Sequence, residues 1–346
     1  MSSNPILLLL ADTDGSIERE VIGSDHQLDM VICPDLKTGL TPEQWSRVQY
    51  IIASHLYTVD KELQDRCPSL KVIVRLGIGV DSIDVAYAAS TGVAVCNVPD
   101  YGIEEVADTT VAHILALFRQ TTALHQALQD GVCYETFTQF VEKAHPSRRI
   151  RGKTLGMIGM GNIGMAVCTR AKALGFDVMV YDPYLRPGTD KALGITQVDS
   201  LDYLIQNSNC VSLHCPLTPE TANVINSKSL QLFKKDAFLV NTSRGGQIDE
   251  AALAEALKSG QLGGAALDVQ VTEPFKLKGS VFDGVPNLIL TPHAAWYSKE
   301  SYEDVRTGAI KAVKFCLTHS DCSRLPNFLN AKTIDKEACK KRWSKL

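Results

Sequence analysis

The alternation of short apolar runs with helix-length segments narrows the possible folds of this 346-residue chain more than any other feature. The first hundred residues contain strand candidates at 6–10, 28–32, 49–54, 71–76 and 93–97. A second group follows at 154–159, 177–182, 210–215, 237–241, 265–269 and 287–292. Such uniformly apolar runs are typical of strands buried on both faces, because helices cover both sides of a parallel sheet. The pattern predicts an α/β chain of parallel βαβ units, and the length indicates two domains or one large one.

A long helical segment lies between the two groups of strands. Residues 102–129 contain no proline, and no glycine after the first position. Their apolar residues recur at helical spacing, which predicts one long helix. Such a helix is either a connector between domains, with an apolar stripe available for a dimer, or part of a core.

The composition excludes several classes of partner. With 45% hydrophobic residues, 21% charged residues and a net charge of −4, the chain gives no electrostatic reason to expect nucleic acid. Its longest apolar runs are strand length, so we expect no membrane span and no secretory signal. The ten cysteines form no C-x-x-C pair and no Cys/His cluster at zinc spacing. We therefore expect reduced thiols, no metal site and an intracellular compartment.

The last three residues suggest a particular compartment. Ser344, Lys345 and Leu346, as a free C-terminus, form an address that the peroxisomal import receptor reads. The alternative is a basic tail that ends in this way by chance, in a cytoplasmic protein. We expect a peroxisomal location.

A glycine-rich turn predicts a dinucleotide site. Gly159, Gly161 and Gly164 have G-x-G-x-x-G spacing, with an apolar strand before them and a helical segment after them. The first glycine permits a tight turn, the second lets the backbone approach a pyrophosphate, and the third lets the helix pack close to the strand. The helix N-terminus, with Asn162 and Ile163, would then present N–H groups to the phosphates.

The next strand ends in a carboxylate. Asp182 follows Gly161 by 21 residues, about where an acidic residue binds the ribose hydroxyls of NAD. A carboxylate at this place would repel the 2′-phosphate of NADP. The sequence therefore favours NAD as the cofactor.

Three further polar residues follow predicted strands in the second half of the chain. Arg244 follows AFLVNTS, Glu273 follows AALDVQVT, and His293 follows NLILTP. Ligands of open α/β sheets bind at the carboxyl ends of strands, so these side chains are expected to converge beside the cofactor. Taken singly, each is more simply an ion pair or a packed histidine; their joint placement favours a site.

Longer motifs resemble a known family. GMGNIG, YDPY, LVNTSRGGQIDEAALAEAL, GGAALDVQVTEP and TPHAAWYS are similar to the D-isomer-specific 2-hydroxyacid dehydrogenases, from about residue 50 to 325. Within that family, CNVPDYGIEEVADTT, TTALHQALQDG and IRGKTLG resemble the C-terminal-binding-protein branch. The resemblance implies two doubly wound parallel-sheet domains, a Rossmann cofactor domain inserted into a flavodoxin-like substrate domain. The substrate domain would comprise residues 1–99 and 299–330, the NAD-binding domain residues 100–298, and the C-terminal tail residues 331–346. It also implies a homodimer supported by the helix at 102–129.

The resemblance also implies roles for single residues. Arg244 would bind the carboxylate and carbonyl of a 2-oxo acid, a task that suits the planar guanidinium. His293 would be the general acid, and Glu273 would orient its imidazole and favour the charged form. Further residues implied at the substrate are His55, Trp296 and the backbone N–H groups of Leu76 and Gly77. Further residues implied at the cofactor are Thr110, Cys215, Pro216, Thr242, Ser243 and Asp268.

Two functions follow as hypotheses. The first is an NAD-dependent oxidoreductase that interconverts a small 2-oxo acid and its D-2-hydroxy acid, with glyoxylate and hydroxypyruvate as the first substrates to consider. The second is a corepressor-like scaffold that senses NAD and binds short peptides, as the most similar branch implies.

Overall fold

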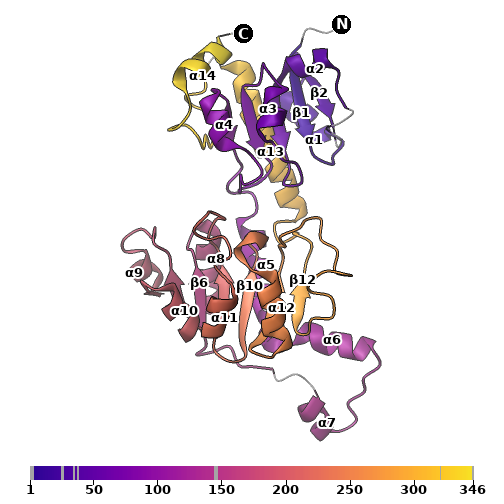
Figure 1. The fold of residues 1–346 in the computed structure, drawn as a ribbon, viewed down its shortest axis with the longest axis vertical. Coiled ribbons are helices and arrows are strands. Elements are labelled where there is room, and N and C mark those ends of the chain that lie inside the picture. The colour runs from indigo at the N-terminus through magenta and orange to yellow at the C-terminus, as the bar shows by residue number, and fades with distance from the viewer. Residues whose placement is uncertain are drawn as a thin grey trace. The chain divides into compact units, whose positions relative to one another are not determined.

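The computed structural model describes residues 4–24, 27–33, 36, 39–143, 147–319 and 321–344. The chain forms two compact units (Figure 1). Unit 1 consists of Met1–Gly102 with Ser298–Leu346, and unit 2 of Ile103–Tyr297. The chain therefore leaves unit 1, completes unit 2 and then returns to unit 1.

Unit 1 contains a parallel sheet of five strands in the order β2-β1-β3-β4-β5. The strands are β1 (Ile6–Leu10), β2 (Asp29–Ile32), β3 (Val48–Ala53), β4 (Val72–Arg75) and β5 (Ala94–Cys96). The helices are α1 (Ser16–Ile22), α2 (Pro42–Arg47), α3 (Lys61–Asp65), α4 (Val85–Ser90), α13 (Lys299–Thr318) and α14 (Lys336–Trp343). This strand order is that of the flavodoxin-like doubly wound fold.

Two buried polar contacts join the C-terminal segment of unit 1 to the N-terminal segment of the same unit. The guanidinium of Arg306 on α13 donates to the carboxylate of Glu18 on α1, with Nε 2.8 Å from Oε1, and the two residues are 5% and 0% exposed. The side chain of Asn330 accepts a hydrogen bond from the N–H of Val95 and donates one to the carbonyl of Val93, each at 2.9 Å. Neither charged group of the ion pair is left unpaired, which is the condition under which charges are tolerated in a core.

Unit 2 contains a parallel sheet of seven strands in the order β12-β11-β10-β9-β6-β7-β8. The strands are β6 (Thr154–Ile158), β7 (Asp177–Tyr181), β8 (Thr196–Gln197), β9 (Cys210–Leu213), β10 (Ala237–Asn241), β11 (Leu262–Leu267) and β12 (Leu288–Leu290). The helices are α5 (Ile103–Arg119), α6 (Thr121–Gln129), α7 (Phe137–Lys143), α8 (Asn162–Ala173), α9 (Thr189–Leu193), α10 (Leu201–Asn207), α11 (Ser227–Leu232) and α12 (Glu250–Lys258). The order extends that of the Rossmann fold, whose direction reverses between β6 and β9.

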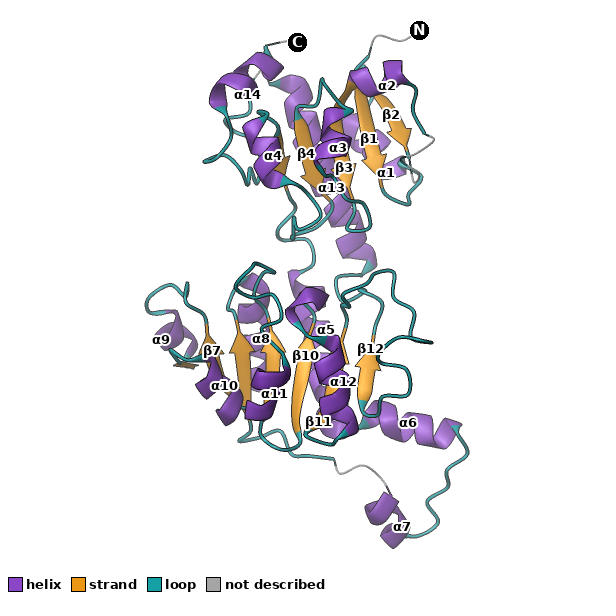
Figure 2. Cartoon of the chain, viewed as in Figure 1, coloured by secondary structure: helices purple, strands orange, loops and turns teal. Residues whose placement is uncertain are grey.

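Helices cover both faces of this sheet (Figure 2). On one face Phe118 of α5 and Val167 of α8 pack with Met157 and other strand residues. On the other face Leu204 of α10 and Leu253 of α12 pack in a second buried cluster. Because both faces are covered, the central strands are mostly apolar and buried, and the predicted α/β fold with two parallel sheets is confirmed.

The single long helix predicted at 102–129 is wrong. The segment forms two helices, α5 and α6, which are separated at Gln120. The backbone of Gln120 is left-handed, with φ 54°, and its side-chain amide donates to the carbonyl of Leu117 at 2.7 Å. A left-handed residue turns the chain out of the α5 axis, so α6 continues in a new direction and has no buried residue.

The C-terminal segment also differs from a simple tail. Residues 336–343 form helix α14, and Arg342 on this helix donates to the carbonyls of Thr91 (2.6 Å) and Leu70 (2.9 Å) in unit 1. Lys345 and Leu346, two of the three residues of the predicted peroxisomal address, lie outside the described residues. Among the described residues, none of the helices has the length and apolar character that a bilayer span requires.

Candidate active site

The glycine-rich turn lies at the point where the strand order of unit 2 reverses. Gly159 follows β6 with φ 91°, and a Cβ at this position would lie 2.7 Å from the backbone nitrogen of Cys215, which follows β9. Only glycine fits both the left-handed backbone and this close approach. Gly161, by contrast, has open space around its Cβ direction, with no atom within 4 Å. The turn is therefore tightly packed on its inner side and accessible where a pyrophosphate would approach.

Helix α8 begins directly after this turn. Gly161 is its N-cap and makes no side-chain capping bond, and Asn162 and Ile163 are its first residues. Gly164 lies one turn on, with its Cβ direction 3.2 Å from the carbonyl of Gly159. The N–H groups of the first turn thus lack a capping side chain, which suits the binding of an anion at the positive end of the helix dipole.

Asp182 stands at the carboxyl end of the neighbouring strand β7. One carboxylate oxygen accepts a hydrogen bond from the N–H of Met160 and the other from the N–H of Tyr184, both at 2.8 Å. These bonds fix the carboxylate beside the glycine-rich turn. A carboxylate held at this place provides the acceptor that ribose hydroxyls need.

The other residues expected at the cofactor follow β9 and β10 or lie on α5. The hydroxyl of Ser243 donates to the carbonyl of Cys215 at 2.7 Å, which joins the loops after the two strands. Thr242 and Thr110, on α5, form a hydrogen bond between their hydroxyl oxygens at 2.8 Å. Pro216 follows Cys215 and is exposed. These residues meet at the same end of the sheet as the glycine-rich turn, and their contacts with a cofactor stay predictions.

Burial sets the titration of two groups in this region. It raises the pKa of the Cys215 thiol to about 11, so the thiol stays protonated at neutral pH. It lowers the pKa of His214 to about 4, and a ring nitrogen of this histidine lies 2.8 Å from the hydroxyl of Ser212. Neither group is therefore a charged nucleophile or acid at neutral pH, and both have a structural role in the walls of the site.

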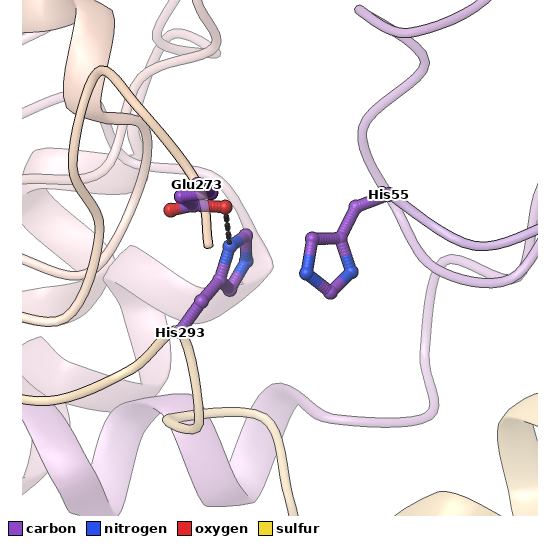
Figure 3. A group of neighbouring side chains, drawn as sticks. All are labelled: His55, Glu273 and His293. Atoms are coloured by element: carbon purple, nitrogen blue, oxygen red, sulfur yellow. Dashed lines mark hydrogen bonds and ion pairs between the residues drawn. The ribbon is translucent and has the colours of Figure 1, made fainter. Parts of the chain in front are cut away.

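The strongest candidate for acid–base chemistry is the pair of His293 and Glu273. The Nδ1 atom of His293 lies 2.7 Å from Oε2 of Glu273 (Figure 3). The second oxygen of Glu273 accepts the N–H of Gln270 at 3.2 Å. The side chains of His293 and Glu273 are only 19% and 21% exposed. A carboxylate held on one ring nitrogen orients the imidazole and leaves the other ring nitrogen for a substrate, so the pair has the arrangement of a general acid–base group.

The backbone of His293 is held in an uncommon conformation. Its φ is 53°, in the left-handed region that residues other than glycine rarely adopt. Its N–H donates to the carbonyls of Asp268 (2.7 Å) and Thr291 (3.1 Å). Such outliers cluster at functional sites, where surrounding contacts maintain the conformation.

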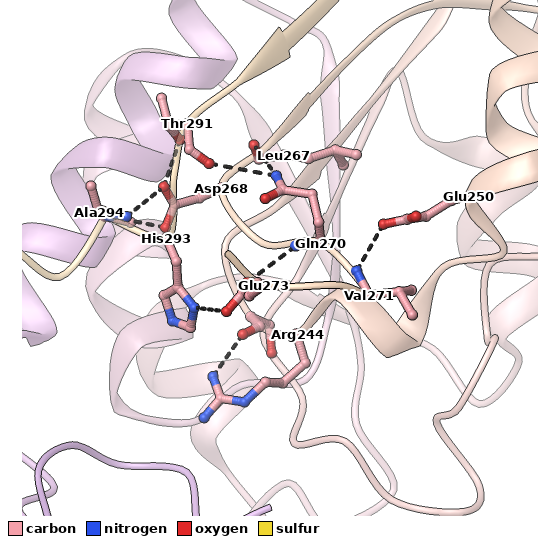
Figure 4. A network of polar contacts seen from close by, with 12 residues as sticks. Arg244, Glu250, Leu267, Asp268, Gln270, Val271, Glu273, Thr291, His293 and Ala294 are labelled. Carbon is pink, nitrogen blue, oxygen red and sulfur yellow. Dashed lines mark hydrogen bonds and ion pairs between the residues drawn. The ribbon is translucent and has the colours of Figure 1, made fainter. Parts of the chain in front are cut away.

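Asp268 organises the segment that carries His293 (Figure 4). Its carboxylate is 1% exposed and accepts hydrogen bonds from the hydroxyl of Thr291 (2.5 Å) and the N–H groups of Ala294 (3.0 Å) and Ala295 (2.9 Å). Asp268 was expected to line the cofactor. Its side chain instead builds the loop around His293, while its contribution to cofactor binding stays a prediction.

Arg244 follows β10 at the same end of the sheet as the acid–base pair (Figure 4). Its guanidinium donates to the carbonyl of Ser243 at 2.8 Å, and its own carbonyl accepts a bond from the side chain of Asn241 at 2.8 Å. A Cβ on the next residue, Gly245, would lie 2.0 Å from the carbonyl carbon of Gln270. The loops that carry Arg244 and Glu273 are therefore in direct backbone contact. The structure brings together Arg244, Glu273 and His293 within unit 2.

Gln247 is a residue that the sequence reasoning missed. It is fully buried, and its side-chain amide donates to the carbonyl of Cys215 at 2.8 Å and accepts the N–H of Arg244 at 3.3 Å. It thus couples the loop that carries Arg244 to the loop after β9. Its position three residues after Arg244, where side chains reach back to a backbone N–H at helix starts, is the signal that identifies it.

The remaining expected residues belong to other parts of the chain. His55 follows β3 of unit 1 and is partly exposed. The N–H groups of Leu76 and Gly77 donate within unit 1, to the carbonyls of Ala53 (2.9 Å) and Arg75 (3.0 Å). To bind a substrate carboxylate, these two groups would have to share or exchange those bonds. Trp296 of unit 2 packs its ring edge-on against Tyr297, with the centroids 5.7 Å apart.

Comparisons with known proteins agree with this architecture. Residues 111–295 match the family model of the D-isomer specific 2-hydroxyacid dehydrogenase, NAD binding domain. Over 339 residues, which are 96% of this chain and 46% of the relative, the chain is 37% identical to C-terminal-binding protein 1 of Caenorhabditis elegans. The chain spans about half the length of the curated relatives it matches.

Solved structures are similar over almost the whole chain. D-lactate dehydrogenase from Aquifex aeolicus, in complex with NAD and lactic acid, has 28% identity and a TM-score of 0.80, over 90% of this chain and 95% of that one. The NADPH-dependent glyoxylate/hydroxypyruvate reductase from Sinorhizobium meliloti, in complex with NADP and malonate, has 27% identity and a TM-score of 0.78, over 94% and 98%. Unit 2 thus contains an NAD-binding domain. The chain belongs to the family of D-isomer-specific 2-hydroxyacid dehydrogenases.

Proposed function

We propose that this protein is an NAD-dependent oxidoreductase that interconverts a small 2-oxo acid and its D-2-hydroxy acid. The observation that carries the proposal is the hydrogen-bonded pair of His293 and Glu273, at the strand ends that also present Arg244 in an NAD-binding domain. An acid–base pair and a cation beside a dinucleotide site are what carbonyl reduction requires.

Each side chain has a defined role in the reaction. Arg244 binds the carboxylate of the 2-oxo acid through parallel hydrogen bonds and orients its carbonyl. His293, protonated, gives its proton to the carbonyl oxygen, and Glu273 stabilises the imidazolium. When bound, the nicotinamide supplies the hydride that reaches the carbonyl carbon. In the reverse direction His293 takes the proton back from the hydroxyl group.

Glyoxylate and hydroxypyruvate are the substrates that we propose to test first. A solved relative with 27% identity is named as a reductase of both compounds. Another relative was solved with lactic acid, so pyruvate completes the initial panel. All three compounds carry a carboxylate next to a carbonyl, which is the pattern that Arg244 and His293 would address together.

We propose that NADH is preferred over NADPH because of Asp182. Its carboxylate, held by two backbone N–H groups at 2.8 Å, would repel a 2′-phosphate. The Asp182→Asn variant keeps a side chain of the same shape without the charge. Because the repulsion is removed, the ratio of kcat/KM for NADPH to that for NADH should rise by about tenfold or more. A tenfold change corresponds to about 1.4 kcal/mol. An unchanged ratio would remove Asp182 from cofactor selection.

The direct test follows NADH absorbance with purified protein and the substrate panel. The His293→Ala variant should lose about 10²–10⁴ in kcat, the range typical of general acid catalysis. The Arg244→Ala variant should lose substrate affinity as well as turnover. Arg324→Ala and His319→Ala are matched controls, because both residues are exposed and belong to unit 1. If wild-type protein consumes no NADH with any 2-oxo acid, the proposal fails.

A scaffold that senses NAD and binds short peptides is the second candidate. The 37% identity to C-terminal-binding protein 1 favours it. Binding of a peptide library to immobilised protein, with and without NADH, separates the two functions. Tight peptide binding without 2-oxo acid reduction would favour the scaffold, and turnover without peptide binding would favour the enzyme.

We also propose that the protein is a homodimer joined through α6 and α7 of unit 2. Both helices project from the sheet of this unit (Figure 1), and several of their apolar residues are exposed. Leu128, Phe137 and Val141 are 61%, 81% and 59% exposed. Exposed apolar residues in this number are typical of an interface. Light scattering of the wild-type protein should give twice the mass of one chain. The Phe137→Ser/Val141→Ser double variant should give the mass of a single chain.

A further inference from the structure

Two cysteines of the C-terminal segment lie in direct contact. Cys322 stands in the turn after α13, and Cys339 lies on α14. Their Sγ atoms are 3.0 Å apart, although 17 positions separate them in the sequence. Cys339 is 4% exposed, whereas Cys322 is partly exposed. A disulfide needs about 2.05 Å between the sulfurs, so the two atoms have to approach by only about 1 Å.

The pair forms part of the wall of a cavity of about 710 Å³. Phe328, Ile334 and Trp343 are among its apolar lining residues, and Lys336 and Lys340 are among its charged ones. A cavity of this size admits small molecules such as a hydroperoxide. The thiols are thus within a hydrophobic pocket that still has access from solvent, which most of the other described cysteines lack.

The two thiols differ in the way that disulfide chemistry requires. The hydrogen bond from the Cys339 thiol lowers the pKa of Cys322 to about 7. The same bond, together with burial, raises the pKa of Cys339. Burial also raises the pKa of Cys67 and Cys96, so these thiols stay protonated. A thiolate is the reactive form of cysteine, and the accessible thiol of the pair is the one that readily becomes a thiolate.

We propose that Cys322 and Cys339 form a redox site that a hydroperoxide converts into a disulfide. The Cys322 thiolate attacks one oxygen of the peroxide, the O–O bond breaks, and Cys322 becomes a sulfenic acid while a hydroxide or alkoxide leaves. The Cys339 sulfur then attacks the sulfur of Cys322, the S–S bond forms, and the S–O bond breaks with loss of water. Two thiols are oxidised by two electrons, and the peroxide takes them up as water or as water and an alcohol. A thiol reductant reverses the change.

The disulfide would fasten α14 to the unit. At present Arg342 holds the helix through bonds to Thr91 and Leu70. The helix also approaches Gly92 so closely that a Cβ there would lie 2.4 Å from the nitrogen of Cys339. These contacts are non-covalent and open when the helix frays. A covalent link at Cys339 closes the loop from Cys322 and opposes that fraying.

The test uses the full-length protein and hydrogen peroxide at a small molar excess. After acid quenching, remaining thiols are alkylated with N-ethylmaleimide under denaturing conditions and counted by intact mass. Wild-type protein should change from ten alkylated thiols to eight, and dithiothreitol should restore ten. A non-reduced tryptic digest should contain residues 315–324 joined to residues 337–340. Since Cys316 shares the first peptide, fragment ions must assign the link to Cys322.

Variants make the result decisive. Cys322→Ser should lose no thiol pair on oxidation. Cys133→Ser, which removes an exposed cysteine distant in the sequence from Cys322 and Cys339, should still lose two thiols. Trypsin should cut at Lys340 and Lys341 several-fold more slowly in oxidised than in reduced wild-type protein, with no such change in Cys322→Ser. The proposal is overturned if wild-type thiols resist peroxide, if Cys322 accumulates as a sulfinic acid without a link, or if the link joins other cysteines.

Discussion

Replacing Asp268 by asparagine should show whether this residue holds the His293 loop or binds the cofactor. The carboxylate accepts three hydrogen bonds, from Thr291, Ala294 and Ala295, in a place where it is 1% exposed. The amide of asparagine has one acceptor oxygen, which can serve the two donors that share one carboxylate oxygen. Its NH₂ group then faces the N–H of Ala295. Both are hydrogen-bond donors, so this N–H is left without an acceptor.

The size of the effect follows from this count. A buried donor without an acceptor costs about 1–3 kcal/mol, and the variant also loses the extra strength of bonds to a charged acceptor. We expect the free energy of unfolding in urea to fall by at least that amount. If the segment 291–295 shifts by about 1 Å, the imidazole is misplaced and kcat falls by about 10²-fold. The dissociation constant of NADH, measured by fluorescence, should change little.

Glu250→Gln is the matched control. Glu250, the first residue of α12, is partly exposed, and its carboxylate accepts a hydrogen bond from the N–H of Val271 at 2.8 Å. The same change from carboxylate to amide should therefore alter stability by less than about 0.5 kcal/mol. The role of Asp268 in holding the His293 loop is refuted if Asp268→Asn is no less stable than Glu250→Gln and keeps its kcat. A large loss of NADH affinity with normal kcat would instead assign Asp268 to the cofactor.

Three further predictions concern the glycine-rich turn, the pH dependence of stability and the C-terminal peroxisomal address. Gly161→Ala should weaken NADH binding by about tenfold without lowering Tm, because its Cβ enters open space, whereas Gly159→Ala should lower Tm by several degrees through a clash with the backbone after β9. The lowered pKa of His214, about 4 against a usual 6.5, means that the unfolded chain takes up a proton first as the pH falls, so this group removes about 2 kcal/mol of stability between pH 7 and pH 5. The His214→Gln variant should lack that part of the pH dependence in urea unfolding, and equal slopes would contradict the assignment. A fluorescent protein fused to the N-terminus should give punctate peroxisomal staining that deletion of Leu346 disperses, and unchanged staining would disprove the address.

Several elements could be predicted because their signals are local. The glycine spacing at 159–164 and the carboxylate at the end of the next strand need only the strands on either side to be identified. Both then follow from where a βαβ unit places its turns. Arg244, Glu273 and His293 were also predictable in this way, because the ends of parallel strands lie on one edge of a sheet.

Other elements depend on neighbours that are distant in the sequence. Strand β11 begins at Leu262, three residues before the predicted start at 265. The prediction missed this start because Gly263 and Gly264 do not have the apolar character of a strand. A Cβ at these positions would lie 2.5 Å from the carbonyl oxygen of Asp236 and 2.9 Å from that of Asn287, so glycine is required by close packing. The break at Gln120 was missed for a related reason, since glutamine carries no propensity for the left-handed conformation that it adopts there.

The amino-acid sequence alone determined the class of fold, the dinucleotide turn and the identity of the side chains available for chemistry. These depend on hydrophobic periodicity and on conformational preferences that each residue carries with it. Tertiary structure decided how those side chains are held: the bond from His293 to Glu273, the burial of Asp268 beneath the 291–295 segment, and the contact between Cys322 and Cys339. Such contacts join residues from separate strands and helices, and only the packing of the whole unit brings their atoms within reach of one another.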